Sequence, residues 1–169
     1  MLICVRHPPV EAEGLCYGQL DLPMTRSPDH WGPTVVWPRG RLWSSPARRC
    51  RALAAWVAEA QGSQLSVDPR LWEMGFGAWE GRKWADLDRT EVEAWSSDWE
   101  RNRPPRGESA LDLQRRVAEW CADLDRSRTH VLVAHAGVVR ALRVVRGGCS
   151  WPDAMARPVP HLRMESFGL

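Results

Sequence analysis

The chain lacks paired cysteine motifs and long apolar segments. Its five cysteines are an odd number without Cys-x-x-Cys spacing, which argues against a disulfide framework and a zinc site. The longest unbroken apolar run, Ala52 to Ala58, is far too short to cross a membrane. We expect no leader because the N-terminus enters a predicted strand at once. A cytoplasmic location is therefore expected.

Dense basic clusters, internal repeats and low-complexity blocks are also absent, apart from the short run Arg48-Arg49-Cys50-Arg51. The net charge is only +2, from 23 basic and 21 acidic residues. A nucleic-acid binder would gather its basic residues on one face, so we expect no nucleic-acid partner. The eleven tryptophans are unusual, and we interpret them as wide apolar anchors that pack helices on a sheet.

The chain does contain strands that alternate with helices. Two apolar runs rich in branched side chains, Leu2–Val5 and Val131–Ala134, are typical of buried parallel strands. Further strands are predicted at 41–43, 64–67 and 161–167, and helices from Ser45 to Gly62, from Ser109 to Leu124 and over 138–145. This order predicts an α/β fold with a mostly parallel sheet. We expect a single domain, 1–169, with a helical insertion around 82–106.

Local signals set the expected helix ends. Ser45 followed by Pro46 predicts an N-cap with proline at the first helical position. Gly62 predicts the end of the same helix. Ser109 and Asp112 have the spacing of a capping box.

Polar side chains stand where predicted strands end and helices begin. Arg6-His7 follows the first apolar run and His135 follows the second, while Arg49 and Glu73 lie beyond two other strands. Ligands of open parallel sheets bind beyond the carboxyl ends of the strands, so these residues should converge. Guanidiniums, imidazoles and helix N-termini together form an anion site, for which phosphate is the obvious ligand.

The same residue types can perform covalent chemistry. A neutral imidazole is a nucleophile, and flanking guanidiniums disfavour its protonation. A nearby carboxylic acid can protonate the leaving oxygen, and Glu73 is a reasonable donor, with Glu80 and Glu108 as competitors. The remaining histidines lack such a context and are predicted to be solvated or structural: His30, His130 and His161.

Five segments occur in the order found in the histidine phosphatase superfamily: Arg6-His7, Ser44 to Arg49, Leu71 to Gly81, Gly107-Glu108-Ser109 and His135-Ala136-Gly137. The resemblance covers nearly the whole chain. It implies a three-layer α/β/α sandwich of the phosphoglycerate mutase-like kind. It also implies a phosphohistidine intermediate that needs neither a metal nor a cofactor.

The resemblance further implies a role for each residue. His7 corresponds to the nucleophile, and Glu73 to the general acid that later acts as a base. Arg6, Arg49 and His135 correspond to the clamp on the phosphate oxygens. Arg49 fits the family's spacing from Ser45, although a slip of one residue to Arg48 stays open.

The loop after the first strand resembles the α-ribazole phosphatase-like branch, which acts late in cobalamin biosynthesis. The matching residues are Arg6-His7-Pro8-Pro9 and Gly14 to Pro23. Substrate contacts are implied for Tyr17, Gly18, Gln19 and Ala136. Two features depart from the family. Pro8 replaces its usual glycine and lacks an N–H, and the short segment 26–42, which holds three prolines, should have a reduced helix.

The expected function is a phosphomonoesterase that hydrolyses a small-molecule phosphate ester through phosphorylated His7. Two alternatives stay open. One is phosphoryl transfer of the phosphoglycerate mutase type, and the other is a catalytically weak phosphate- or phosphoprotein-binding module, for which Pro8 is one motive. We expect no membrane partner. The sequence leaves open which ester is the substrate and whether the chain is a monomer or a homodimer.

Overall fold

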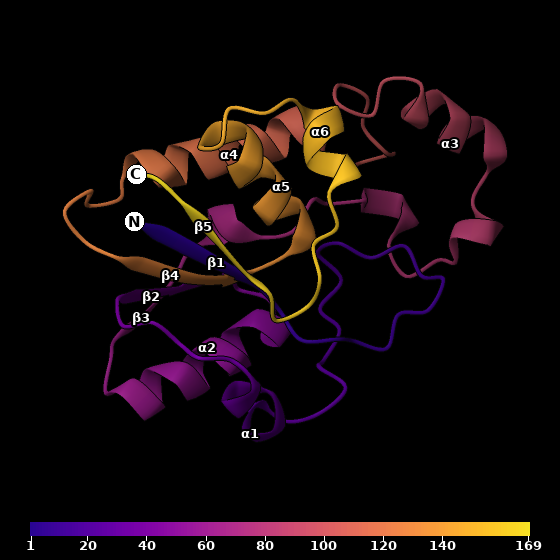
Figure 1. Ribbon diagram of the computed structural model, residues 1–169. Helices are drawn as coiled ribbons and strands as arrows, with labels where there is room; N and C mark the ends of the chain where they lie inside the picture. The colour runs from indigo at the N-terminus through magenta and orange to yellow at the C-terminus, as the bar shows by residue number, and fades with distance from the viewer.

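The computed structural model describes residues 1–169 and places helices on both faces of a central five-stranded sheet (Figure 1). The strands are β1 (Leu2–Arg6), β2 (Arg41–Ser44), β3 (Leu65–Val67), β4 (His130–Ala134) and β5 (Met164–Phe167). Their spatial order is β3-β2-β4-β1-β5. Only β5 is antiparallel to its neighbour. The predicted α/β class with a mostly parallel sheet is confirmed.

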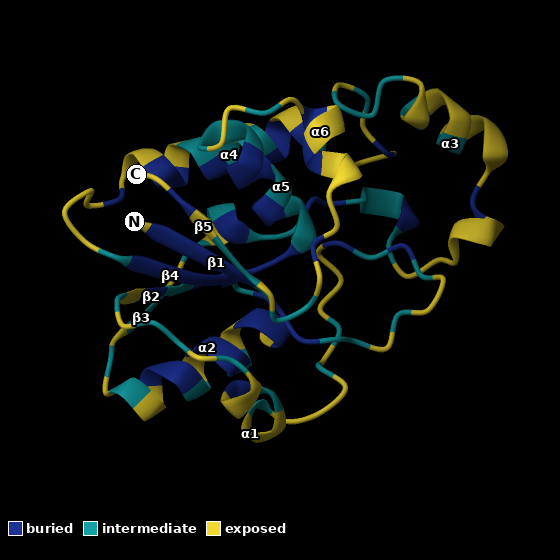
Figure 2. Ribbon diagram, viewed as in Figure 1, coloured by how far each residue is buried: buried dark blue, intermediate teal, exposed yellow.

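The two central strands bring distant residues together at one edge of the sheet. All of β4 and most of β1 are buried (Figure 2), as expected for strands covered on both faces. In their parallel register Arg6 pairs with Ala134, and the His7 amide donates to the Ala134 carbonyl at 2.9 Å. The chain therefore leaves both strands side by side, at His7 and at His135.

The helices form the two outer layers of the predicted sandwich (Figure 1). One face carries α1 (Pro28–Trp31) and α2 (Arg48–Gln61), and the other carries α4 (Ala110–Ala122), α5 (Ala136–Val145) and α6 (Trp151–Ala156). The remaining α3 (Arg89–Ser96) projects away from the sheet and is mostly exposed (Figure 2). Short 3₁₀ turns occur at Gly32–Thr34, Pro69–Leu71, Gly77–Trp79 and Trp84–Asp86. None of the helices combines the length and apolar character that a membrane crossing requires.

The cores on the two faces differ in size. The larger one joins the sheet to α4 and α5 and contains the fully buried Trp120. The smaller one packs Cys50 and Leu53 of α2 against Val133. Cys50 is a buried free thiol, as expected from the apolar patterns around the cysteines. Burial of a large aromatic side chain is worth several kcal/mol, so Trp120 is a main anchor of the larger core.

Several predicted helix ends agree with the structure. Ser109 and Asp112 form both hydrogen bonds of the capping box at the start of α4. Gly62 ends α2 in the left-handed conformation, with φ 60°. The segment 26–42 retains only the single turn α1 and one 3₁₀ turn, which confirms that its helix is reduced.

Two predicted boundaries are wrong. Helix α2 begins at Arg48, with Ala47 at the N-cap and no side-chain cap. The Ser45 hydroxyl accepts a hydrogen bond from the Ala47 amide at 3.3 Å and is hydrogen-bonded to His135 Nε2 at 2.7 Å, so it joins the helix start to His135 rather than capping the helix. The last strand begins at Met164 rather than at His161. Leu162 has φ 60°, a left-handed conformation that no strand residue adopts.

Candidate active site

The two histidines that follow β1 and β4 lie against one another at the carboxyl edge of the sheet. The His7 and His135 ring centroids are 5.2 Å apart, with the rings inclined by 67°. His7 is 2% exposed and His135 is fully buried. Their juxtaposition follows directly from the register of β1 with β4.

The tautomer of His7 is set by the residue that follows it. His7 Nδ1 lies 2.6 Å from the Pro8 carbonyl oxygen. A carbonyl can only accept, so Nδ1 carries the proton and Nε2 keeps its lone pair. Burial, followed by the charge of Arg49, holds the pKa of His7 well below its usual value. His7 is therefore a neutral imidazole at neutral pH.

His135 is held neutral in a similar way. Burial holds its pKa well below the usual value, with further contributions from His7 and Arg49. Its Nε2 is hydrogen-bonded to Ser45 Oγ at 2.7 Å, and Cys50 Sγ lies 3.6 Å from the same nitrogen. His135 is also the N-cap residue of α5, so its position is fixed by both the sheet and the helix.

Arg49 is fully buried and is bonded to the loop that follows β1. Its Nη1 and Nη2 donate to the carbonyls of Leu20 at 2.8 Å and Gly18 at 2.5 Å. The guanidinium also lies 5.5 Å from the centre of the Tyr17 ring. Arg48, in contrast, is exposed. The structure therefore favours Arg49 over Arg48 as the arginine that faces His7.

Two of the arginines expected in the phosphate clamp have unsatisfied donors. The Nε atoms of Arg6 and Arg49 are buried without a hydrogen-bond partner. Arg6 is otherwise anchored by Nη1, which donates to the Val159 carbonyl at 2.7 Å. Buried donors are rarely left unpaired. Arg6 lines the cavity that contains His7, whereas Arg49 does not.

The Glu73 carboxylate is oriented by two backbone amides. Its Oε1 accepts from Met74 at 2.9 Å, and its Oε2 accepts from Gly137 in the first turn of α5 at 3.0 Å. A Cβ on Gly137 would lie only 2.1 Å from Glu73 Oε1. Glycine at position 137 is therefore what allows the carboxylate to reach the helix N-terminus.

The two other candidates for the general acid, Glu80 and Glu108, hold loops in place. Glu80 accepts hydrogen bonds from the backbone amides of Gln19, Leu20 and Phe76. Glu108 forms an ion pair with Arg116, with an oxygen–nitrogen distance of 2.9 Å. Of the three candidates, Glu73 is the carboxylate that shares a cavity with His7.

Arg116 fixes the segment that carries Glu73. Its guanidinium donates to the carbonyls of Arg70, Trp72 and Glu73 at 2.6 to 2.9 Å. The ion pair with Glu108 holds the guanidinium in place. The backbone on either side of Glu73 is thus restrained by a side chain from α4.

A cavity of about 350 Å³ is lined by three of the predicted site residues, Arg6, His7 and Glu73, but not by Arg49 or His135. Its polar residues are Arg6, His7, Glu73 and Arg140. Six aromatic side chains line the rest of it, together with smaller apolar residues: Tyr17, Phe76, Trp84, Trp95, Trp99 and Trp151. Several predicted helix anchors among the tryptophans thus form walls of this cavity, which offers a polar end next to an apolar one.

Of the four residues with implied substrate contacts, two lie at or next to the cavity, and two are hydrogen-bonded to neighbouring parts of the protein. Tyr17 lines the cavity, and Ala136 is the first residue of α5, beside Gly137. Gly18 presents its carbonyl to Arg49. The exposed Gln19 instead fastens the loop, because its Nε2 donates to the Glu73 carbonyl at 3.2 Å.

The structure brings two further residues to the site, Arg140, which the sequence did not indicate, and His161, which was expected to be solvated or structural. Arg140, three residues beyond Gly137 on α5, lines the cavity, and its buried Nε has no hydrogen-bond partner. Helical spacing from Gly137 could have identified it. His161 contacts His7, with 5.3 Å between the ring centroids. No local sequence pattern marks His161, because its position depends on how the chain turns before β5.

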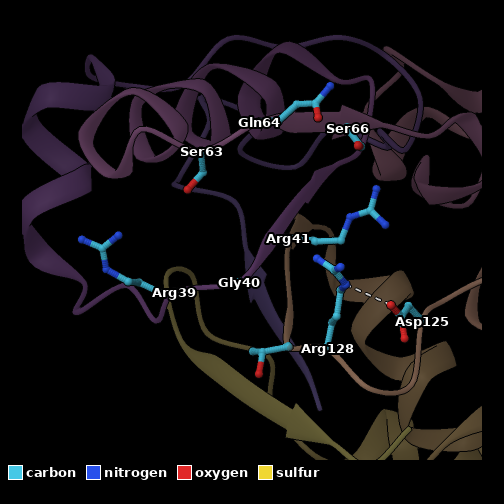
Figure 3. Close-up of a pocket in the computed structure, with 9 residues that line it drawn as sticks. Arg39, Gly40, Arg41, Ser63, Gln64, Ser66, Asp125 and Arg128 are labelled. Carbon is cyan, nitrogen blue, oxygen red and sulfur yellow. Dashed lines mark hydrogen bonds and ion pairs between the residues drawn. The ribbon is translucent and has the colours of Figure 1, made fainter.

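A larger open hollow of about 770 Å³ lies near the amino ends of β2, β3 and β4. It is lined by polar and charged residues that include Arg39, Arg41 and Arg128 (Figure 3). Asp125 pairs with Arg128 there at 3.0 Å. The hollow contains no histidine or cysteine and is at the edge of the sheet opposite His7, so it is separate from the candidate active site.

Known proteins are similar to this chain in both sequence and fold. The sequence model of the histidine phosphatase superfamily (branch 1) matches residues 31–161, a range that begins after Arg6-His7. The adenosylcobalamin/alpha-ribazole phosphatase of Salmonella typhimurium is 32% identical over 151 residues, covering 82% of this chain and 75% of the relative. The glucosyl-3-phosphoglycerate phosphatase of Mycobacterium tuberculosis is 35% identical over 154 residues, covering 73% and 68%.

A solved structure extends the comparison to the fold. The alpha-ribazole phosphatase from Shigella flexneri has a TM-score of 0.83 at 24% sequence identity, over 96% of this chain and 87% of that chain. The likeness confirms the predicted phosphoglycerate mutase-like architecture. The family model covers most of the chain and includes Arg49, Glu73 and His135. The chain therefore belongs to the histidine phosphatase superfamily, branch 1.

Proposed function

We propose that this phosphatase hydrolyses a small-molecule phosphate monoester through a phosphoryl group carried on His7 Nε2. The observation that carries the proposal is the state of His7. Its Nδ1 is committed to the Pro8 carbonyl, and its pKa is held low by burial. A neutral imidazole with a free Nε2 lone pair, in one cavity with Glu73, is an activated nucleophile beside an acid.

In the first step, His7 Nε2 donates its lone pair to phosphorus and forms the P–N bond. The bond from phosphorus to the leaving oxygen breaks, and the Glu73 carboxyl group gives its proton to that oxygen. The Pro8 carbonyl, which accepts from Nδ1, stabilises the positive charge that the ring acquires. Arg6, Arg49 and His135 would hold the other phosphate oxygens in line for transfer.

In the second step, a water molecule attacks phosphorus while the Glu73 carboxylate takes one of its protons. The P–N bond breaks, its electron pair returns to His7 Nε2, and inorganic phosphate is released. Glu73 is then protonated again. The hydrogen bonds that Glu73 receives from Met74 and Gly137 keep its carboxylate in one orientation through both steps.

For the substrate we propose α-ribazole phosphate, and hence a role in cobalamin biosynthesis. The aromatic walls of the cavity beside His7 suit the flat base of this nucleoside, because aromatic rings prefer to pack against one another. The similarity to the Salmonella typhimurium enzyme supports the same substrate. The five free cysteines support a reducing compartment, and we propose the cytoplasm.

The test compares wild-type protein with His7→Ala on an aryl phosphate. We expect vanadate to inhibit the wild type, radioactive substrate phosphate to label it, and the variant to lose about 1,000-fold or more in kcat. His30→Ala changes an exposed histidine of α1 and should behave like the wild type. Full turnover by His7→Ala would refute the proposal.

A substrate panel separates the remaining alternatives. It includes α-ribazole phosphate, sugar phosphates, phosphohistidine peptides and phosphoglycerates. A preference for α-ribazole phosphate is expected. Bisphosphoglycerate-dependent isomerisation without phosphate release would instead favour a mutase. Tight binding of an ester without hydrolysis of any compound would favour a binding module.

A further inference from the structure

The segment that precedes β5 is tied to the end of β1 by three hydrogen bonds. His161 Nδ1 lies 2.6 Å from the His7 carbonyl oxygen. The Leu162 amide donates to the Arg6 carbonyl at 3.0 Å, and Arg6 Nη1 donates to the Val159 carbonyl at 2.7 Å. These hydrogen bonds join residues that are more than 150 positions apart in sequence, at the end of β1 that leads into His7.

The backbone of this segment adopts an unfavourable conformation at one residue. Leu162 has φ 60°, a left-handed conformation that is unfavourable for a residue other than glycine. Such strain persists where surrounding contacts impose it, and it is often found at functional sites. Here the turn at Leu162 keeps His161 out of β5, which begins only at Met164.

The His161 side chain contacts the ring as well as the backbone of His7. The ring centroids are 5.3 Å apart and the rings are inclined by 61°. A carbonyl can only accept, so His161 Nδ1 carries the proton of the hydrogen bond to His7. His161 therefore contacts both the backbone and the ring of His7.

We propose that His161 is a positioning residue that keeps His7 Nε2 aimed at phosphorus. The proposal rests on the proposed role of His7 as the nucleophile. His161 acts through His7, and it is not among the residues that line the aromatic cavity. Loss of His161 should therefore slow phosphoryl transfer and leave substrate binding nearly unchanged, because small misplacements of a reacting atom greatly reduce the rate.

Three variants separate the two contacts of His161. His161→Asn keeps an N–H donor near the Nδ1 position but has no ring, and His161→Phe keeps a ring without a donor. His161→Ala removes both. The rate of phosphohistidine formation is measured in a single turnover with a radioactive aryl phosphate, alongside kcat and KM. Thermal unfolding is followed for every variant, with His30→Ala as the matched control.

For His161→Ala we expect kcat to fall about 100-fold, with KM within about threefold of the wild type. His161→Asn and His161→Phe should each recover part of the loss. A wild-type rate of phosphohistidine formation in His161→Ala would overturn the inference. A rise in KM at unchanged kcat would also overturn it, because it would identify a substrate contact.

The same experiment distinguishes failure of this inference from failure of the proposed function. If the wild type forms no phosphohistidine, the role of His7 is refuted and that of His161 with it. If the wild type is labelled and every His161 variant is labelled at the same rate, only the role of His161 is refuted. Should His161→Ala fail to fold, His161→Asn and His161→Phe decide the outcome.

Discussion

At Pro8 the site loses a backbone N–H but keeps the backbone carbonyl that is hydrogen-bonded to His7. Proline removes the N–H that the usual glycine would offer to phosphate. Its carbonyl oxygen remains and accepts a hydrogen bond from His7 Nδ1, with the two atoms 2.6 Å apart. This hydrogen bond sets the tautomer of the nucleophile. The substitution therefore affects one donor toward phosphate and leaves the orientation of His7 intact.

Arg140 gives the first prediction at this scale. Its buried Nε has no partner, and burial lowers the pKa of its guanidinium. We expect Arg140→Met to weaken substrate binding about tenfold, because a charged hydrogen bond contributes about 1.5–3 kcal/mol. The same change should raise Tm, since it removes a buried donor that lacks a partner. KM, inhibition by inorganic phosphate and thermal unfolding measure the two effects.

Arg143, one turn further along α5, is the matched control for Arg140. It is bonded to Glu165 and to the carbonyls of Ala154, Arg157 and Pro158. Arg143→Met should lower Tm, because these groups would lose their donor. An Arg140→Met variant with unchanged KM would show that Arg140 does not contact the substrate.

At the scale of elements, the start of α5 fixes the position of the general acid. A Cβ at position 137 would lie 2.1 Å from Glu73 Oε1. We therefore expect Gly137→Ala to displace the carboxylate and to lower kcat about 100-fold. Gly168→Ala is the control, because a Cβ there meets no atom within 4 Å. Normal kcat in Gly137→Ala would mean that Glu73 has no required contact with α5.

The elements differ in how far the sequence could predict them. The apolar patterns identified β1 and β4, and with them the meeting of His7 and His135. The start of α2 lies three residues beyond the predicted N-cap Ser45, whose hydroxyl is shared between the Ala47 amide and His135, and the contact with His135 forms only in the folded chain. His161 was missed for a related reason. Its place depends on the left-handed Leu162, and leucine carries no signal for that conformation.

At the scale of the whole molecule, the cavity is assembled from segments far apart in sequence. Tyr17 comes from the loop after β1, Trp84 and Trp95 from the segment that includes α3, and Trp151 from α6. Each tryptophan alone resembles a helix anchor, so the sequence could not indicate that they surround one space. The phosphate end of the site was predictable because strand ends in a parallel sheet must converge.

The buried imidazoles make the stability of the whole molecule depend on pH. His7 and His135 have pKa values well below the ordinary value of 6.5 in the folded protein. Below about pH 6.5 the unfolded chain binds protons that the folded protein excludes, so acid favours unfolding. Above that pH both states are neutral at these residues, and this contribution is constant.

We therefore expect the free energy of unfolding to fall by up to about 1.4 kcal/mol per pH unit for each of His7 and His135 between about pH 6.5 and pH 5. Burial also lowers the pKa of His161, which adds to the same slope. Carboxylates such as Asp112, whose pKa is lowered by Arg103, act only below about pH 5. Urea unfolding at several pH values measures the slope. His135→Asn should reduce the slope, and the control His30→Ala should leave it unchanged. A stability that is independent of pH across this range would contradict the neutral state of both histidines. It would also remove the main support for His7 as a nucleophile at neutral pH.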